Sequence, residues 1–187
     1  MTLHDYLGIV RRSWPLILIA TLVGTLVALG LSLAMTPVYQ AQSQLFVSVK
    51  SAGQVGDAYS GGLFVQQRVK SYVDVVDSPA VLDPVIQDLG LDMTYTQLAP
   101  QASAQTPPNT VLLNVTATDT SPTQAAKIAN AVATSYAAEI ARLEGAETKA
   151  NQVPVQASVI KPAEVPTSPV SPRTSLNVLL GLLLGLL

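Results

Sequence analysis

The sequence contains no cysteine and only one histidine, and 12% of its residues are charged. Without cysteine there is no disulfide framework, no thiolate metal site and no cysteine nucleophile. Ten basic residues stand against twelve acidic ones, and this near-balance excludes a nucleic-acid-binding domain of the usual basic kind. Globular domains carry about twice this charged fraction, and the mean hydropathy is +0.39. The composition therefore indicates a membrane protein.

A run of twenty uncharged residues from Leu16 to Met35 predicts a transmembrane helix, because it would be about 30 Å long. A signal peptide is the alternative interpretation, since basic residues precede the run. Its apolar region would be only about 7–15 residues long, with small residues at a cleavage site behind it. Met35-Thr36-Pro37 does not form such a site, so we expect an uncleaved anchor.

A second apolar run begins at Leu176 and continues to Leu187, where the sequence ends. Its twelve residues would form about 18 Å of helix, which is too short to cross a bilayer. We interpret the run as the start of a second transmembrane helix that the sequence truncates. A short tail packed on the first helix is the alternative.

Basic residues before the first span predict that the N-terminus is cytoplasmic. Arg11 and Arg12 precede the span and Trp14 lies at its boundary, as expected for the cytoplasmic interface. The expected topology is a helical hairpin that holds one extracytoplasmic α+β domain. Residues 1–13 are expected to form a cytoplasmic N-terminal segment, and residues 14–35 the first transmembrane helix. Residues 36–172 are expected to form the extracytoplasmic domain with a proline-rich end, and residues 173–187 the start of a second transmembrane helix.

Hydrophobic patterning predicts the elements of the domain between the spans. Alternation of apolar and polar residues favours strands at 38–50, 110–118 and 153–160. Three- and four-residue spacing favours helices at 63–76, 79–89 and from 122 onward. Residues 94–105 are ambiguous. The order of these elements predicts an α+β fold whose first and last strands are neighbours in one sheet.

Capping signals mark the ends of two of these helices. Ser78 and Ser121 each precede a proline, the arrangement of an N-cap before a first-turn proline, and Gly90 is placed to end the first of the two helices. The second helix would reach up to about 30 residues, or about 45 Å. Its alanine-rich apolar stripe is interpreted either as core or as a surface that packs against a neighbouring copy.

No catalytic constellation is expected in the domain, because no histidine follows His4. Ser-His-Asp and metal-histidine arrangements are therefore excluded there. His4 is interpreted as a solvated polar residue, and carboxylate pairs such as Asp74 with Asp77 as solvated helix faces. We expect no catalytic, cofactor-binding or metal-binding residue, and no cofactor.

Two features outside the domain core are candidates for function. Small residues recur at four-residue spacing in both apolar runs and predict faces for close helix packing: Ala20, Gly24, Ala28, Gly181 and Gly185. Three prolines, here named the juxtamembrane Pro motif, recur at every third position before the second run: Pro166, Pro169 and Pro172. This spacing favours an extended polyproline II rod, and a stiff linker or a proline-rich ligand are the alternatives.

The arrangement of several short segments resembles a known family. Residues 165–185 read VPTSPVSPRTSLNVLLGLLLG, residues 125–131 read AAKIANA, and residues 37–41 read PVYQA directly after the first span. Together with the opening segment from Leu3 to Trp14, they resemble the chain-length determinant (Wzz-type) family of polysaccharide co-polymerases. The resemblance covers essentially the whole chain.

The resemblance implies a multi-pass protein of the bacterial plasma membrane that assembles into a ring-like homo-oligomer. It implies control of the polymerisation or export of a capsular, exopolysaccharide or O-antigen glycan, with the polymerase or export machinery as partner and with no enzymatic activity in this chain. Members often continue into a cytoplasmic tyrosine autokinase or pair with one, so the membrane-sensor half of a tyrosine kinase is an alternative. A membrane-anchored adaptor of another envelope complex is a further alternative. Membrane lipid is an expected partner, and nucleic acid is not.

Overall fold

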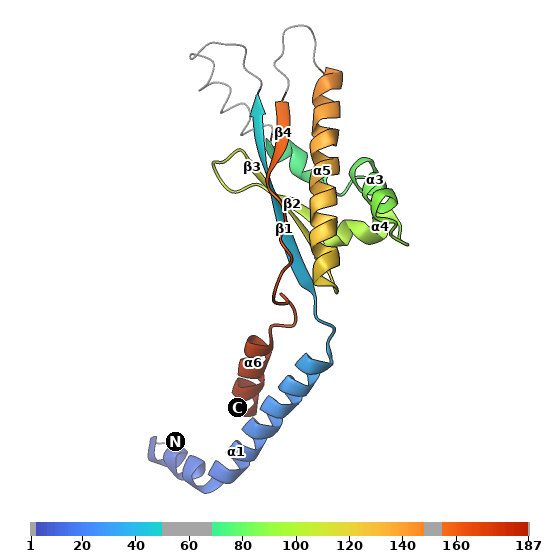
Figure 1. The fold of residues 1–187 in the computed structure, drawn as a ribbon. Coiled ribbons are helices and arrows are strands. Elements are labelled where there is room, and N and C mark those ends of the chain that lie inside the picture. The colour runs from blue at the N-terminus through green and yellow to red at the C-terminus, as the bar shows by residue number, and fades with distance from the viewer. Residues whose placement is uncertain (1–2, 50–68, 148–154, 187) are drawn as a thin grey trace. The chain divides into compact units, whose positions relative to one another are not determined.

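The computed structural model describes residues 3–49, 69–147 and 155–186 (Figure 1). The chain divides into two compact units. One consists of Met1–Val38 together with Pro169–Leu187, and the other consists of Tyr39–Ser168. The first unit is built from the two apolar runs, and the second contains all the strands of the sheet.

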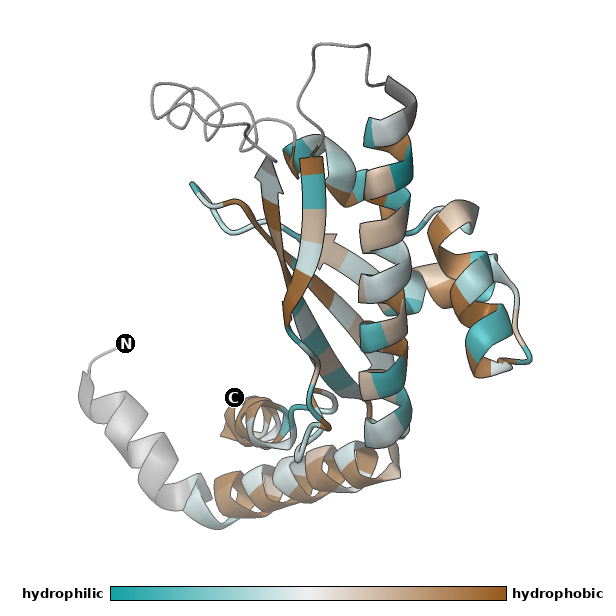
Figure 2. Cartoon of the chain, turned by 45° about the horizontal axis from the view of Figure 1, so that its top comes forward, coloured by the Kyte–Doolittle hydropathy of each residue, from teal (hydrophilic) through white to brown (hydrophobic). Residues whose placement is uncertain are grey.

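The first unit contains helices α1 (Leu3–Ala34) and α6 (Thr174–Leu186). Within α1, the segment Ser13–Ala34 is 22 residues long, and it is long and apolar enough to cross a membrane. Figure 2 shows apolar residues around this segment and along α6. The expected first apolar helix is thereby confirmed. Helix α6 has 13 residues, too few to cross a bilayer, so the second span stays a prediction.

Helix α1 begins well before the expected span and includes Pro15 inside it. Proline has no N–H to donate to the preceding turn and its ring crowds the carbonyl there, which bends a helix. Figure 1 shows α1 bending between its first turns and its apolar part. The residues from Leu3 onward therefore form one helix with the apolar segment.

The second unit is an α+β domain built on a four-stranded antiparallel sheet (Figure 1). The strands are β1 (Tyr39–Val49), β2 (Ala102–Gln105), β3 (Leu112–Asp119) and β4 (Val155–Lys161), in the order β2-β3-β1-β4. Strand β1 pairs with β4 over its second half. The expectation that the first and last strands are neighbours is confirmed.

The described helices of this unit gather on one face of the sheet. Helix α5 (Pro122–Glu147) packs on β1, β3 and β4, and α3 (Pro79–Leu89) packs beside α5. Helix α4 (Tyr95–Leu98) and the short 3₁₀ helices η1 (Val73–Val75) and η2 (Ala99–Gln101) complete this layer. Of the helix expected at 63–76, residues 63–68 lie outside the described residues, and residues 69–75 are helical.

The core lies between the sheet and α5. Alternate residues of β1 and β3 face inward and are buried, as the period-two pattern predicts: Ala41, Leu45, Val47, Leu113, Val115 and Ala117. They meet the apolar stripe of α5, which is also buried: Ala125, Ile128, Ala129, Val132, Ala133, Tyr136 and Ile140. Of the two interpretations of that stripe, core packing is confirmed.

The helix ends agree with the expected positions but not always with the expected chemistry. Gly90 ends α3 in the left-handed conformation with φ of 60°, which a residue without Cβ adopts at no steric cost. Ser121 Oγ accepts a hydrogen bond from Gln124 N at 3.4 Å at the start of α5. Ser78 is the N-cap residue of α3 and Pro79 follows it, as expected. Its hydroxyl, however, caps no N–H and has no hydrogen-bond partner among the described residues.

Candidate functional site

The two apolar helices lie side by side (Figure 1), and their backbones approach closely at three glycines. A Cβ built on Gly24 would lie 2.6 Å from Gly181 O, and one built on Gly181 would lie 2.5 Å from Ala28 Cβ. A Cβ on Gly185 would lie 2.7 Å from Ala20 O. The structure thus brings together all five small residues singled out from the sequence. Such close backbone approach is how helices associate where lipid removes the hydrophobic drive.

Polar side chains also join the two helices. Thr21 Oγ1 lies 2.8 Å from Ile17 O and 3.2 Å from Gly185 O, and it can donate to either. Ser32, which is only 3% exposed, donates to Thr174 Oγ1 at 3.3 Å and accepts from Asn177 Nδ2 at 3.3 Å. Sequence reasoning missed these contacts. The signal available for them was the presence of polar residues inside two apolar runs, where such residues usually face another helix.

The residues taken as topology markers lie in the first half of α1. Arg11 and Arg12 lie within the helix, and their side chains are outside the described part of the structure. Trp14 is 60% exposed, as suits a side chain at a membrane interface. The direction of insertion stays a prediction.

The juxtamembrane Pro motif does not form one straight rod. The backbone bends at residues 170 and 172, and Val38 holds the segment by three hydrogen bonds. Val38 N donates to Ser171 O at 2.9 Å, while Val170 N and Ser171 N both donate to Val38 O, at 2.8 and 3.4 Å. The expectation of a continuous polyproline II rod was wrong, because this bridge fixes the last part of the segment against the residue that follows the first span.

Asn130 fixes the other end of the same segment on α5. Its Oδ1 accepts a hydrogen bond from Ala163 N at 2.7 Å, and its Nδ2 donates to Ala163 O at 3.0 Å. One side-chain amide therefore satisfies both backbone groups of a residue that is only 8% exposed. Asn130 lies inside the AAKIANA segment, but no local pattern identifies its partner.

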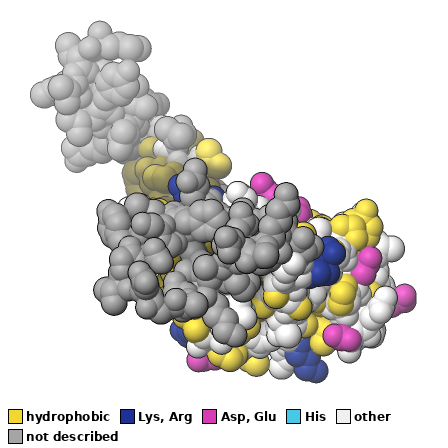
Figure 3. Space-filling model, turned by 90° about the horizontal axis from the view of Figure 1, so that it is seen from above, with side chains coloured by type: hydrophobic (Ala, Val, Ile, Leu, Met, Phe, Trp, Pro, Cys, Tyr) yellow, Lys and Arg dark blue, Asp and Glu magenta, His cyan; other side chains and the backbone are white. Residues whose placement is uncertain are grey.

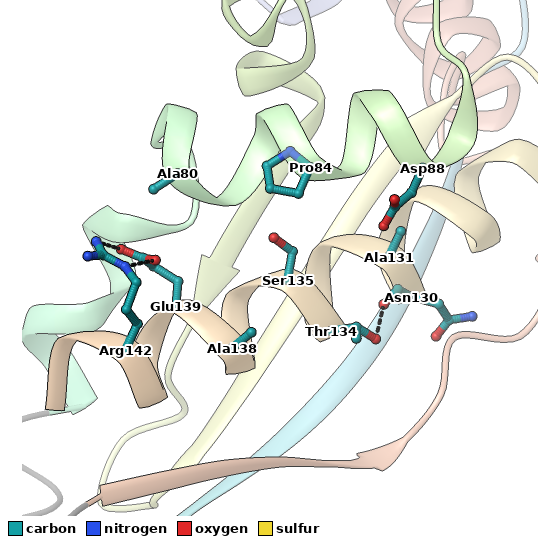
Figure 4. Close-up of a pocket in the computed structure, with 10 residues that line it drawn as sticks. All are labelled: Ala80, Pro84, Asp88, Asn130, Ala131, Thr134, Ser135, Ala138, Glu139 and Arg142. Carbon is teal, nitrogen blue, oxygen red and sulfur yellow. Dashed lines mark hydrogen bonds and ion pairs between the residues drawn. The ribbon is translucent and has the colours of Figure 1, made fainter. Parts of the chain in front are cut away.

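A groove of about 630 Å³ runs between α3 and α5 (Figure 4). Ala80, Pro84 and Asp88 line one side, and small and polar residues of α5 line the other. At one end, Arg142 donates two hydrogen bonds to the carboxylate of Glu139, at 2.6 and 2.7 Å. These hydrogen bonds lower the pKa of Glu139 from its usual value, against the opposing effect of burial. The pair is a charged feature at the rim of the groove and not a catalytic arrangement.

A second polar contact lies under α5. Tyr136 is fully buried and its hydroxyl donates to Tyr72 O at 2.6 Å, while the Tyr72 hydroxyl donates to Glu144. Burial raises the pKa of Tyr136 far above its usual value, so this phenol stays protonated. The network ties residues 69–75 to α5 and is structural.

The described residues contain few of the side-chain groups that catalysis or metal binding requires. Among them, no group of three or more His, Cys, Asp or Glu side chains is placed to hold a metal ion. On the face seen in Figure 3, acidic and basic side chains are scattered and do not gather by sign. The arrangement can support membrane anchoring and close contact between the two apolar helices.

Comparison with known proteins supports the family resemblance seen in the sequence. Residues 1–89 match the family model described as Wzz, chain length determinant protein. The resemblance to the Wzz family is confirmed. The match covers the first span, β1 and α3, and it indicates no catalytic family.

Three relatives are similar to this chain along nearly its whole length. The probable capsular polysaccharide biosynthesis protein YwqC of Bacillus subtilis (strain 168) is 27% identical over 188 residues, covering 99% of this chain and 73% of the relative. The capsular polysaccharide biosynthesis protein CpsC of Streptococcus pneumoniae is 27% identical over 188 residues, covering 98% and 78%. The capsular polysaccharide biosynthesis protein CapA of Staphylococcus aureus is 26% identical over 180 residues, covering 94% and 76%.

Proposed function

We propose that this chain is a chain-length determinant of the co-polymerase type, which regulates the polymerisation or export of a bacterial capsular polysaccharide. The observation that carries the proposal is the alignment of nearly the whole chain with three capsular polysaccharide biosynthesis proteins, joined to the Wzz match over residues 1–89. The chain acts without enzymatic activity of its own, by binding and positioning other components.

The proposed topology is a hairpin in the plasma membrane. Helix α1 is the first span, α6 is the start of the second, and residues 36–172 lie outside the cytoplasm. Three observations support it: the apolar length of α1, the contact of α6 with α1 through glycines, and the antiparallel pairing of β1 with β4. A strand that leaves one span and a strand that returns to the next are then neighbours.

The proposed partners are further copies of this chain in a ring-like homo-oligomer, the polysaccharide polymerase or export machinery, membrane lipid, and a cytoplasmic tyrosine kinase. The five small residues of α1 and α6 hold the spans together within each copy. The juxtamembrane Pro motif ends in the bridge to Val38, which ties the residues before the second span to the residue that follows the first.

Deleting the gene and restoring it from a plasmid tests the proposed function. Cells without the protein should still make polymer, but the length distribution of that polymer should change. The plasmid should restore the original distribution. Unchanged polymer length after deletion would contradict the proposal.

Cysteine labelling tests the topology, since the chain has no native cysteine. Gln87→Cys, at an exposed position of α3, should react with a membrane-impermeant maleimide in intact cells, and a cysteine added before Met1 should react only after permeabilisation. The reverse pattern would contradict the proposed orientation.

A further inference from the structure

The face of the sheet that points away from α5 has an unusual composition. Because successive side chains of a strand alternate between faces, the buried residues of β1 and β3 leave the other half pointing outward. On β1, β2 and β3 we call this set the outer sheet face: Gln40, Gln42, Gln44, Phe46, Ser48, Ser103, Gln105, Leu112, Asn114, Thr116 and Thr118. None of its members carries a charge, and each is exposed or half-buried.

The strand register arranges the polar groups of the outer sheet face in rows. One row crosses three strands through Ser103, Thr116 and Gln42, and the next crosses them through Gln105, Asn114 and Gln44. Neighbouring members already pair: Gln44 Nε2 donates to Asn114 Oδ1 at 2.8 Å, and the hydroxyls of Ser103 and Thr116 lie 2.6 Å apart. The rows are therefore held in place before any ligand binds.

Hydrogen-bonding capacity remains on the same face. The side-chain amides of Gln40, Gln42 and Gln105 have no hydrogen-bond partner in the described part of the chain. Each amide offers two donors and an acceptor. Phe46 follows Gln44 as the next outward residue of β1, and the residue is 41% exposed. Free amides thus lie on the same sheet surface as an accessible aromatic ring.

The lack of charge limits what this face can bind. Designs of soluble surfaces aim for about 25–35% charged residues. In this unit, exposed charged residues occur on α3 and α5, among them Asp83, Asp88 and Lys127. At the margin of the outer sheet face, Lys161 is the register partner of Gln44. An anionic or cationic polymer would find little complementary charge on the three strands themselves.

We propose that the outer sheet face binds uncharged sugar units of a polysaccharide chain. Each sugar hydroxyl both donates and accepts, as the side-chain amides and hydroxyls of the rows do. The apolar face of a sugar ring can lie on the ring of Phe46. A second copy of this chain fits less well, because the centre of a protein interface is mostly apolar, and amides buried without partners destabilise it. The inference rests on the proposed function, to which it adds direct contact with the polymer.

Binding of sugar oligomers to the full chain in detergent micelles tests this inference. The probe is the polysaccharide of the host, cut to oligosaccharides by mild acid, and calorimetry gives the Kd. Gln42→Glu keeps the side-chain length but adds charge, and Phe46→Leu keeps apolar area but removes the ring. Each should raise the Kd about tenfold, the effect of losing one good contact. Phe46→Tyr and the exposed α3 variant Gln87→Glu are matched controls that should bind as the unaltered chain does.

Several outcomes would overturn the inference. These are no binding by the unaltered chain at millimolar oligosaccharide, equal weakening by Gln87→Glu, or unchanged Kd in both Gln42→Glu and Phe46→Leu. A loss of oligomer mass caused by Gln42→Glu in native mass spectrometry without sugar would assign the face to a contact between copies instead. If polymer length in cells depends on the chain but the binding measurements contradict the inference, the proposed function stands and only the sugar-binding face is wrong. If polymer length does not depend on the chain, the proposed function itself fails.

Discussion

Replacing Asn130 by alanine removes both hydrogen bonds that hold Ala163 on α5, at 2.7 and 3.0 Å. Ala163 is only 8% exposed, so water does not readily replace the lost partner. A buried donor left without an acceptor costs about 1–3 kcal/mol. If the cost is local, it makes opening of this segment about 5 to 150 times more frequent, because each 1.4 kcal/mol is about a factor of ten.

Hydrogen–deuterium exchange of the full chain in detergent measures this opening directly. Peptides that contain Ala163 should exchange faster in Asn130→Ala, while peptides from β3 should not change. Asn130→Asp keeps an acceptor for Ala163 N and should show a smaller effect. Thr134→Ala is the matched control, one turn along α5 (Figure 4), because Thr134 is exposed and its hydroxyl donates only to the helix carbonyl of Asn130. Equal exchange in Asn130→Ala and the unaltered chain would refute the reasoning.

Three further predictions concern other contacts. Gly181→Ala places a methyl group 2.5 Å from Ala28 Cβ and should lower the melting temperature of the chain in micelles. Gly30→Ala is the control and should not lower it, because a Cβ there meets nothing within 4 Å. Equal melting temperatures of the two variants would contradict the close contact. Because its pKa is lowered in the folded protein, Glu139 should add stability above the ordinary carboxylate pKa of 4.5 and lose that contribution as the pH falls through its folded pKa. The small melting-temperature deficit of Glu139→Gln should therefore be full at pH 7 and shrink steadily as the pH is lowered into the acid range. A deficit independent of pH would contradict this. Changing the three prolines of the juxtamembrane Pro motif to glycine should leave the protein in the membrane but alter polymer length, because proline restricts φ and glycine would loosen this segment. An unchanged polymer length would mean that the motif is a simple spacer.

The elements that could be predicted are those whose local pattern and tertiary role agree. Strand β1 was expected at 38–50 and extends over Tyr39–Val49, because alternate residues face a real core. Helix α3 lies at the expected residues, because Pro79 and Gly90 restrict the backbone at its two ends. In both cases the signal lies within the segment itself.

The elements that were missed depend on partners far along the chain. Residues 94–105 were ambiguous because α4 and β2 have only four residues each, too few for a period to show. Strand β2 becomes a strand by pairing with β3. Asn130 contacts a residue 33 positions away, and a single asparagine in a helix gives no pattern that names its partner. The composition of the outer sheet face could be read from the sequence, but its rows required the strand register.

The most direct test of the proposed function measures polymer length in isolated membranes. Membranes from cells with and without this chain are supplied with labelled sugar precursors, and both the incorporated label and the molar-mass distribution of the product are measured. A chain-length determinant should change the length distribution while leaving synthesis active in both preparations. Identical length distributions at equal incorporation would contradict the proposed function.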